Sequence, residues 1–167
     1  MKLSKLTIFC IAALITSIVF NTVFFTVFRY SGIEERLQPY FIDFKKEMSS
    51  NGIDLDLDVV FATVSGEFDT EVIAYCNNIT SFQKIIRYNP YYFFNSSEES
   101  RLATVYHELG HCMFDIDHID GNEKGLVGEY GNLCPDSLMT TYGDTYDGCF
   151  FKYKEYYIKE LLTHVKK

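Results

Sequence analysis

Apolar and polar positions divide the chain into one long apolar run and a longer region of mixed patterns. Residues 6–28 form a run of 23 residues without a charge, interrupted only by Thr, Ser and Asn. This exceeds the roughly 20 residues that a helix needs to cross the hydrocarbon core of a bilayer. Lys2 and Lys5 precede the run, which predicts a cytoplasmic N-terminus. The pattern predicts a signal anchor over residues 1–30 and one domain over residues 31–167, outside the cytoplasm.

A cleaved signal peptide is the alternative to the anchor, and it would also export residues 31–167. The apolar core of such a peptide normally covers about 7–15 residues and ends at a site of small residues. Here Phe24, Phe25 and Phe28 fill the end of the run. A single-pass membrane protein is therefore favoured over a protein secreted after cleavage.

Hydrophobic periodicity predicts a helix and three strands after the apolar run. Pro39 fits the first turn of a helix whose apolar positions recur to Met48, and Asn51 and Gly52 end it. Three β-branched and apolar segments follow, at residues 57–64, 71–76 and 82–88. Turns are expected between and after them, at residues 65–66, 77–78 and 89–90.

A second helix and a C-terminal helix complete the predicted elements. Ser96 and Glu99 match the capping box S-x-x-E at the start of the second helix, which then carries apolar residues at helical spacing from Leu102 to Met113. An irregular acidic loop runs from residue 115 to about residue 148, and apolar positions from Tyr157 onward predict the last helix. This order of elements is typical of an α+β fold.

Charge excludes one class of partner. Residues 31–167 hold 12 basic and 23 acidic residues, a net charge of −11. Nucleic-acid binding requires clustered Lys and Arg for the phosphates, so no nucleic-acid partner is expected.

Four cysteines lie in the predicted exported domain: Cys76, Cys112, Cys134 and Cys149. An even number in an exported domain permits disulfides, and four cysteines allow three pairings that the sequence does not distinguish. Four buried thiols are the alternative.

Residues 107–111 read His-Glu-Leu-Gly-His, an H-E-x-x-H motif on the second predicted helix. His107 and His111 are four residues apart on one helical face, so both imidazoles can reach a single Zn²⁺ ion. Glu108 lies beside them as a general base for a zinc-bound water, whose pKa zinc lowers from 15.7 towards roughly 7. The motif predicts one zinc ion per chain.

A catalytic zinc site usually has three protein ligands and one water, so a third ligand is expected. His118, seven residues after His111, is the favoured residue because a chain that turns back after the helix could bring it to the metal. His164 is predicted to lie at the surface. The alternative third ligands are Asp115, Asp117, Glu123 and Glu129, and a site without any of these ligands is the remaining alternative.

Residues 107–118, His-Glu-Leu-Gly-His-Cys-Met-Phe-Asp-Ile-Asp-His, followed by Ser-Leu-Met at 137–139, resemble the metzincin clan of zinc metallopeptidases. Within the clan, they are most similar to small bacterial and phage metallopeptidases with H-E-L-G-H-C and a late third histidine. The resemblance implies His107, His111 and His118 as zinc ligands, Glu108 as general base, and Met139 in a turn beneath the metal.

The resemblance also implies a fold and a way of binding substrate. The fold would be a small zincin-like domain with a short mixed sheet, an active-site helix and a C-terminal helix. An extended peptide would pair with an edge strand that precedes the helix, and residues 71–76 or 82–88 would fill that role.

The chain departs in two places from the usual metzincin pattern, H-E-x-x-H-x-x-G-x-x-H. Phe114 stands at the glycine position, and the third histidine comes one residue late, with Asp117 in its usual place. Since Phe is poor in the left-handed conformation that lets a helix end there, another residue must take over that turn. Tyr142, three residues beyond Met139, is left without a role.

The sequence thus predicts a zinc-dependent endopeptidase that hydrolyses peptide bonds with a zinc-activated water, its partners being a peptide or protein substrate and the membrane. One alternative is a catalytically silent zinc-binding protein with a fourth ligand from Asp115, Asp117 or Cys112. The other is a metal-free, membrane-anchored envelope or phage accessory protein. Glu108 favours the enzyme, because a purely structural zinc site has no need of that carboxylate.

Overall fold

The structure is a computed structural model that describes residues 32–69, 71–80, 83–119, 125–141 and 146–165. The chain divides into two compact units, Met1–Gly32 and Ile33–Lys167. The predicted membrane span at residues 6–28 lies outside the described residues. Among the residues that are described, no helix is both long and apolar enough to cross a bilayer.

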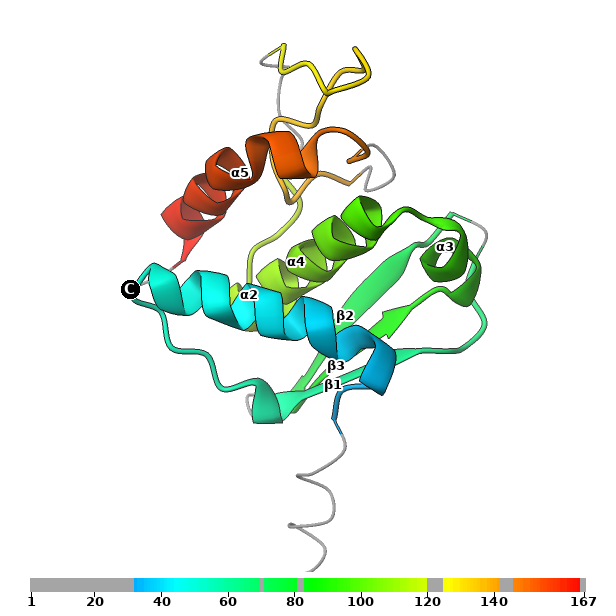
Figure 1. Ribbon diagram of the computed structural model, residues 1–167. Helices are drawn as coiled ribbons and strands as arrows, with labels where there is room; N and C mark the ends of the chain where they lie inside the picture. The colour runs from blue at the N-terminus through cyan, green and yellow to red at the C-terminus, as the bar shows by residue number, and fades with distance from the viewer. Residues whose placement is uncertain (1–31, 70, 81–82, 120–124, 142–145, 166–167) are drawn as a thin grey trace, which may run out of the picture. The chain divides into compact units, whose positions relative to one another are not determined.

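The second unit is an α+β fold with a three-stranded mixed sheet and several helices (Figure 1). In chain order its elements are η1 (Glu35–Leu37), α2 (Gln38–Ser50), η2 (Leu57–Val59), β1 (Val60–Val64), β2 (Ala74–Thr80), β3 (Gln83–Tyr88), α3 (Pro90–Asn95), α4 (Glu98–Phe114) and α5 (Phe150–His164). The predicted α+β class is confirmed.

The sheet has the strand order β1-β3-β2, with β3 parallel to β1 and antiparallel to β2. The outer edge of β1 is covered in part, because Ile33 bridges Ala62 and the Glu34 N–H donates to Ala62 O at 2.9 Å. In the described part of the chain, nothing pairs with the outer edge of β2. The free edge next to the long helix is therefore β2, and the expectation that residues 82–88 could be an edge strand is wrong, because β3 is central.

Helix α4 is the centre of the unit. It contacts β2 and β3 on one side and α2 and α5 on the others (Figure 1). Its residues Leu102, Val105, Tyr106 and Leu109 are buried in one core with apolar residues of the sheet, α2 and α5. A helix with burial on so many sides holds its side chains in fixed positions, which suits a functional site.

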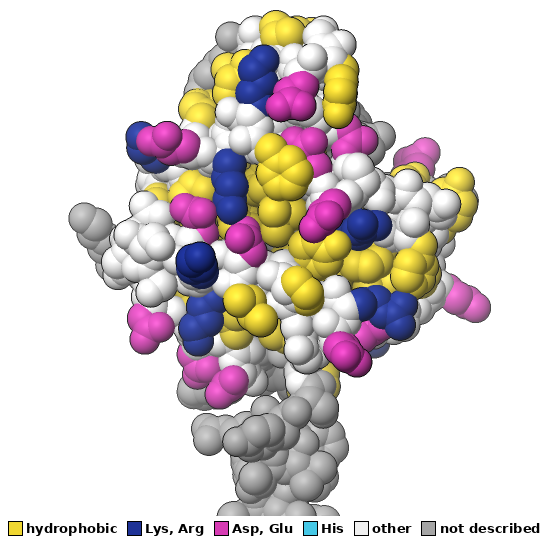
Figure 2. All heavy atoms as spheres, viewed as in Figure 1, with side chains coloured by type: hydrophobic (Ala, Val, Ile, Leu, Met, Phe, Trp, Pro, Cys, Tyr) yellow, Lys and Arg dark blue, Asp and Glu magenta, His cyan; other side chains and the backbone are white. Residues whose placement is uncertain are grey.

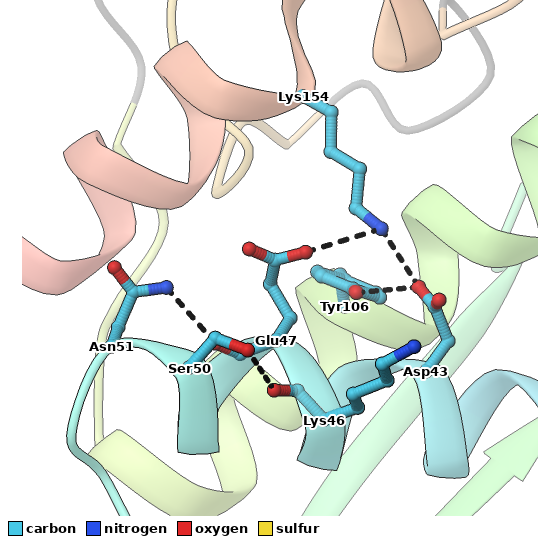
Figure 3. A network of polar contacts seen from close by, with 7 residues as sticks. All are labelled: Asp43, Lys46, Glu47, Ser50, Asn51, Tyr106 and Lys154. Atoms are coloured by element: carbon cyan, nitrogen blue, oxygen red, sulfur yellow. Dashed lines mark hydrogen bonds and ion pairs between the residues drawn. The ribbon is translucent and has the colours of Figure 1, made fainter.

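A polar network joins the three helices on the side of α4 that faces α2 (Figure 3). The Tyr106 hydroxyl of α4 donates to Asp43 Oδ2 of α2 at 2.7 Å. Lys154 of α5 donates to the same oxygen at 2.9 Å, and its Nζ lies 3.4 Å from Glu47 Oε2. The buried tyrosine hydroxyl thereby has a charged partner that is itself neutralised.

The start of α4 differs from the predicted capping box. Ser97, one residue later than predicted, is the N-cap, and its hydroxyl accepts from the Ser100 N–H at 3.1 Å. Ser96 instead donates to Tyr92 O at 2.6 Å, because residues 90–95 form helix α3 where only a turn was expected. Glu99 accepts from the Gly148 and Phe151 N–H groups, at the beginning of α5.

Two of the predicted strands also begin or end elsewhere. The segment predicted as a strand at residues 57–64 begins with the 3-10 helix η2. The Asp56 carboxylate caps this helix by accepting from the Asp58 N–H. Strand β2 continues through residues 77–78, where a turn was expected. It does so because it pairs there with β3, and Lys84 of β3 donates to Asn78 Oδ1 at 3.1 Å.

Two disulfides settle the pairing that the sequence left open. Cys76–Cys112 joins β2 to α4, and Cys134–Cys149 joins the loop to the residue before α5. The first bond fixes the free edge strand to the helix one residue beyond His111.

Candidate metal site

His107, Glu108 and His111 all belong to the second half of α4. The two histidines are one helical turn apart, and their Nε2 atoms lie 2.9 Å from each other. The H-E-x-x-H motif therefore has the helical arrangement that its spacing predicts.

His118 reaches the same place because of how α4 ends. The helix continues through Phe114, and Asp115 takes the left-handed conformation with φ 56° and ψ 41°. Asp adopts this conformation more readily than most residues that carry a Cβ. The chain reverses there and brings His118 Nε2 to 3.3 Å from His107 Nε2.

Backbone carbonyls fix the two helical imidazoles. His107 Nδ1 lies 2.8 Å from Leu138 O, and His111 Nδ1 lies 2.5 Å from Ile116 O. A carbonyl only accepts, so each Nδ1 carries the proton and each Nε2 keeps its lone pair. Carbonyl partners of this kind orient metal-binding histidines in proteins.

The three histidines converge on one small volume, and one ligating nitrogen of each lies within 4.8 Å of the others. Burial lowers the pKa of His107 to about 3, with neighbouring His111 acting in the same direction, and burial also lowers the pKa of His111. Both rings are therefore neutral at pH 7 and free to bind a cation. These histidines could hold a metal ion.

The spacing fits a small tetrahedral ion. Ligand nitrogens at about 2.0–2.1 Å from a tetrahedral zinc lie about 3.3–3.4 Å apart. The His107–His118 separation of 3.3 Å matches, and the His107–His111 separation of 2.9 Å is slightly shorter. In the part of the chain that the structure describes, no carboxylate or thiol joins this group.

Glu108 adds a buried carboxylate to the site. Its side chain is only 4% exposed, and its Oε2 has no hydrogen-bond partner in the protein. Burial raises the pKa of Glu108 to about 8. An unsatisfied buried carboxylate is costly, and such groups are concentrated where chemistry needs them.

A turn that contains Leu138 and Met139 is hydrogen-bonded to the site. Leu138 O accepts from His107, and also from the Tyr146 hydroxyl at 2.6 Å. The N–H of Ile119, next to His118, donates to Met139 O at 2.8 Å. This turn is thus tied to two of the three histidine segments.

Gly110 lets that turn pack directly against α4. A Cβ at position 110 would lie 2.5 Å from Met139 Sδ and 3.2 Å from Leu161 Cδ1. Met139 itself is fully buried. The glycine inside H-E-L-G-H therefore has a packing reason, since any larger residue would push the methionine away from the helix.

Two hollows meet at the site. One, of about 230 Å³, is lined by residues 71–74 and by Thr104, His107, Thr141 and Tyr146. The other, of about 370 Å³, is lined by Ala74, Tyr75, Cys76 and Asn78 and by His111 and residues 115–117. Ala74, Glu108 and His118 line both hollows. Together they form a groove along the free edge of β2, with the histidines at its middle.

The alternative third ligands that the structure describes lie outside the histidine group. Asp115 and Asp117 are exposed on the rim of the groove and do not belong to the histidine group. Glu129 lies in the loop, where its N–H donates to Gly148 O at 2.7 Å. Glu123 and Tyr142 lie outside the described residues. His164 is on α5, 40% exposed, with Nε2 3.2 Å from Glu160 Oε1.

Sequence reasoning missed Tyr146 and Glu160, two of the residues that support the site. Glu160 of α5 accepts from the Ser137 hydroxyl at 3.0 Å, and Ser137 Oγ accepts from the Met139 N–H at 3.0 Å. Tyr146 binds Leu138 O as described above. Neither Tyr146 nor Glu160 belongs to a local motif, because their partners are more distant in sequence, whereas Ser137 and Gly110 lie inside stretches that the sequence singled out.

Comparisons of the chain with protein-family models, with curated proteins and with solved structures found no significant match. Function has to be inferred from the geometry of the site.

Proposed function

We propose that this protein is a zinc-dependent endopeptidase related to the metzincins. One observation carries the proposal: three imidazole Nε2 atoms converge beside a buried carboxylate oxygen that has no partner in the protein. The site lies in a groove next to an unpaired strand edge. Ligands, a proton acceptor and a surface for an extended chain thus occur together.

Zinc is the metal proposed for His107, His111 and His118. Imidazole ligands suit zinc, and three protein ligands with one open position are typical of catalytic zinc. When bound, zinc supplies Lewis-acid chemistry, acidifying a water molecule and polarising a carbonyl oxygen. The catalytically silent alternative is weakened, because Cys112 is in a disulfide and is no thiolate ligand.

Glu108 is proposed to move the proton. Its carboxylate takes a proton from the attacking water and returns it to the amine that leaves when the peptide bond breaks. A pKa near the working pH suits a group that must both accept and donate, and burial raises the pKa of Glu108 to about 8. The free Oε2 leaves room for that proton.

The free edge of β2 is proposed to bind the substrate. A peptide laid along it as an extra strand would gain main-chain hydrogen bonds, and its side chains would enter the two hollows. Residues Ala74 and Glu108 line both hollows, so the scissile bond would lie where the hollows meet.

The end of α4 supports the metzincin resemblance. The pattern H-E-x-x-H-x-x-G-x-x-H has its glycine three residues before the third histidine. In this chain the left-handed residue, Asp115, also lies three residues before His118. The helix is one residue longer than the pattern requires, and the turn and the late histidine are displaced together.

The proposed location is the outer side of a membrane, with residues 6–28 as a single-pass anchor. Two disulfides support a location outside the cytoplasm, since disulfides form and persist in oxidising compartments. Secretion after cleavage of the same run would be equally compatible with them.

The test is digestion of a complex peptide mixture by the purified full chain in detergent. The metal is removed with a chelator, and one half of the sample is then supplied with zinc and dialysed. New internal peptide termini, identified by mass spectrometry, are expected only in the zinc-loaded half. A zinc-loaded protein that produces no new termini at any pH between 6 and 9 would overturn the proposal.

A further inference from the structure

The two hollows of the groove differ in the charges on their rims. Asp115 and Asp117 line the larger hollow, and both side chains are exposed. Neither forms an ion pair with a Lys or Arg of the described residues. Glu71 is among the residues that line the smaller hollow. No Lys or Arg is among the residues that line either one.

Another face of the molecule shows a different pattern. Where α2 is seen from outside, Lys and Arg are interspersed with Asp and Glu, and no described histidine is visible (Figure 2). Charges there neutralise one another, as Lys154 does with Asp43 and Glu47. The residues that line the groove thus include acids and no Lys or Arg, whereas Lys and Arg are interspersed with the acids on the face around α2.

The larger hollow also contains a buried acceptor. Glu108 lines it, is 4% exposed, and has an oxygen without a partner in the protein. Asn78 of the edge strand also lines this hollow, and Lys84 Nζ donates to its Oδ1 at 3.1 Å and to Cys112 O. A bound group at this end of the groove would thus meet the two rim carboxylates, which have no ion-pair partner among the described residues, and the buried acceptor of Glu108, while the Lys84 ammonium is held by its own hydrogen bonds.

We propose that the substrates are cationic peptides, with a Lys or Arg side chain in the hollow rimmed by Asp115 and Asp117. This inference rests on the proposed peptidase function. The hollows follow one another along β2 and meet at Ala74, Glu108 and His118. The cationic residue therefore lies on one fixed side of the cleaved bond, and the residue on the other side enters the smaller hollow, between Val72, Thr104 and Tyr146.

The experiment uses the zinc-loaded full chain and synthetic peptides built on one sequence that it cleaves. Single positions on both sides of the cleaved bond carry Lys, Gln or Glu, and kcat/KM is measured for each peptide. Asp115→Asn with Asp117→Asn removes the rim charges. Asn tolerates the left-handed conformation required at position 115. Asp54→Asn with Glu35→Gln is the matched control, since both are exposed acids that line neither hollow.

At one position of the peptide, kcat/KM is expected to be higher with Lys than with Glu, both for the wild type and for the control variant. The rim variant is expected to lower that ratio by roughly fivefold to tenfold, with zinc content unchanged. The ratio is also expected to fall as NaCl rises from 0.05 to 0.5 M, because exposed charges are screened. The salt series needs no variant, so it remains informative if the rim variant does not fold.

The failures are distinguishable. Absence of cleavage in every peptide would overturn the proposed function, and this inference with it. Cleavage without preference for Lys, or a preference that survives both the rim variant and high salt, would overturn the inference alone.

Discussion

Tyr106 and Glu108 are two residues apart on α4, and both are buried, but the tyrosine hydroxyl has a hydrogen-bond partner and one carboxylate oxygen of the glutamate has none. The Tyr106 hydroxyl donates to Asp43, which Lys154 neutralises (Figure 3). The Glu108 Oε2 has no partner in the protein. A hydrogen bond to a charged partner stabilises the fold by about 1.5–3 kcal/mol, whereas a buried unpaired group destabilises it. One side of the helix therefore carries a buried polar group with a charged partner, and the other carries a buried carboxylate oxygen without one.

The comparison teaches where function is to be sought in this fold. A few other buried side-chain atoms also have no partner, among them the Tyr88 hydroxyl and Glu160 Oε2. Glu108 differs from these because it lies in the groove in which the three histidines converge. The variants below test whether the two sides of α4 are as different in function as they are in structure.

The largest expected effect is that of Glu108→Gln on peptidase activity. Removing the proton acceptor is expected to lower kcat by roughly 10²–10⁴-fold while zinc content stays at the wild-type level. Tyr106→Phe is the matched control on the opposite side of the helix and is expected to retain activity. Equal losses in the two variants, measured on the same peptide, would contradict the assignment.

Removal of the disulfides is expected to have the next largest effect. Loop-closure entropy predicts that Cys76→Ser with Cys112→Ser lowers the free energy of unfolding by about 4 kcal/mol, for a separation of 36 residues. Cys134→Ser with Cys149→Ser is expected to cost about 3 kcal/mol, for a separation of 15 residues. Denaturant unfolding followed by circular dichroism measures both.

Only the first disulfide lies next to the groove, since Cys112 follows His111 and Cys76 lines the larger hollow. Its loss is therefore also expected to raise KM in folded protein, by releasing the edge strand from the helix. A rise in KM of the same size after loss of Cys134–Cys149 would show that the effect is one of general stability.

The stability of metal-free protein is expected to depend on pH through Glu108. Its pKa is about 8 in the folded state and about 4.5 when exposed, so the native state holds a proton that the unfolded state has lost between these values. Stability from this group is present at low pH and declines as pH rises towards 8. From pH 6 to pH 8 the decline is about 2 kcal/mol.

Subtracting the free energy of unfolding of Glu108→Gln at each pH removes the contribution of the histidines, which both proteins share. The difference between wild type and variant is expected to shift against the wild type as the pH rises. A difference that stays constant from pH 6 to pH 8 would mean that Glu108 is ionised throughout.

Tyr106→Phe is expected to have the smallest effect. Loss of the hydrogen bond to Asp43 is expected to lower the free energy of unfolding by about 1–2 kcal/mol, because Asp43 keeps its pairing with Lys154. Equilibrium unfolding in urea measures it. An unchanged free energy of unfolding would show that the hydrogen bond between Tyr106 and Asp43 does not stabilise the fold.

The local part of the site could be predicted from the sequence. His107, Glu108 and His111 are fixed relative to one another by helical geometry, which needs no tertiary information. The position of His118 depends on the left-handed conformation of Asp115, three residues earlier. Asp favours that conformation over Phe114 and Ile116, but Asp117 shares the preference, so the sequence left several third ligands open.

Other features required the folded chain. The pairing of Cys76 with Cys112 follows from strand β2 lying on α4, which is a long-range contact. Strand β2 continues through two asparagines because β3 supplies the partners, and tertiary pairing overrides their turn propensity. The N-cap of α4 lies at Ser97 rather than Ser96 because the preceding residues form a helix of their own.

The central claim is that three histidines bind one zinc ion, and zinc content per chain tests it most directly. The full chain is stripped of metal, supplied with zinc and dialysed, and wild type is compared with His118→Ala and His164→Ala. One zinc is expected in the wild type and in His164→Ala, and a weakened or lost zinc in His118→Ala. A wild type without zinc, or a His118→Ala variant that binds zinc with unchanged affinity, would contradict the claim.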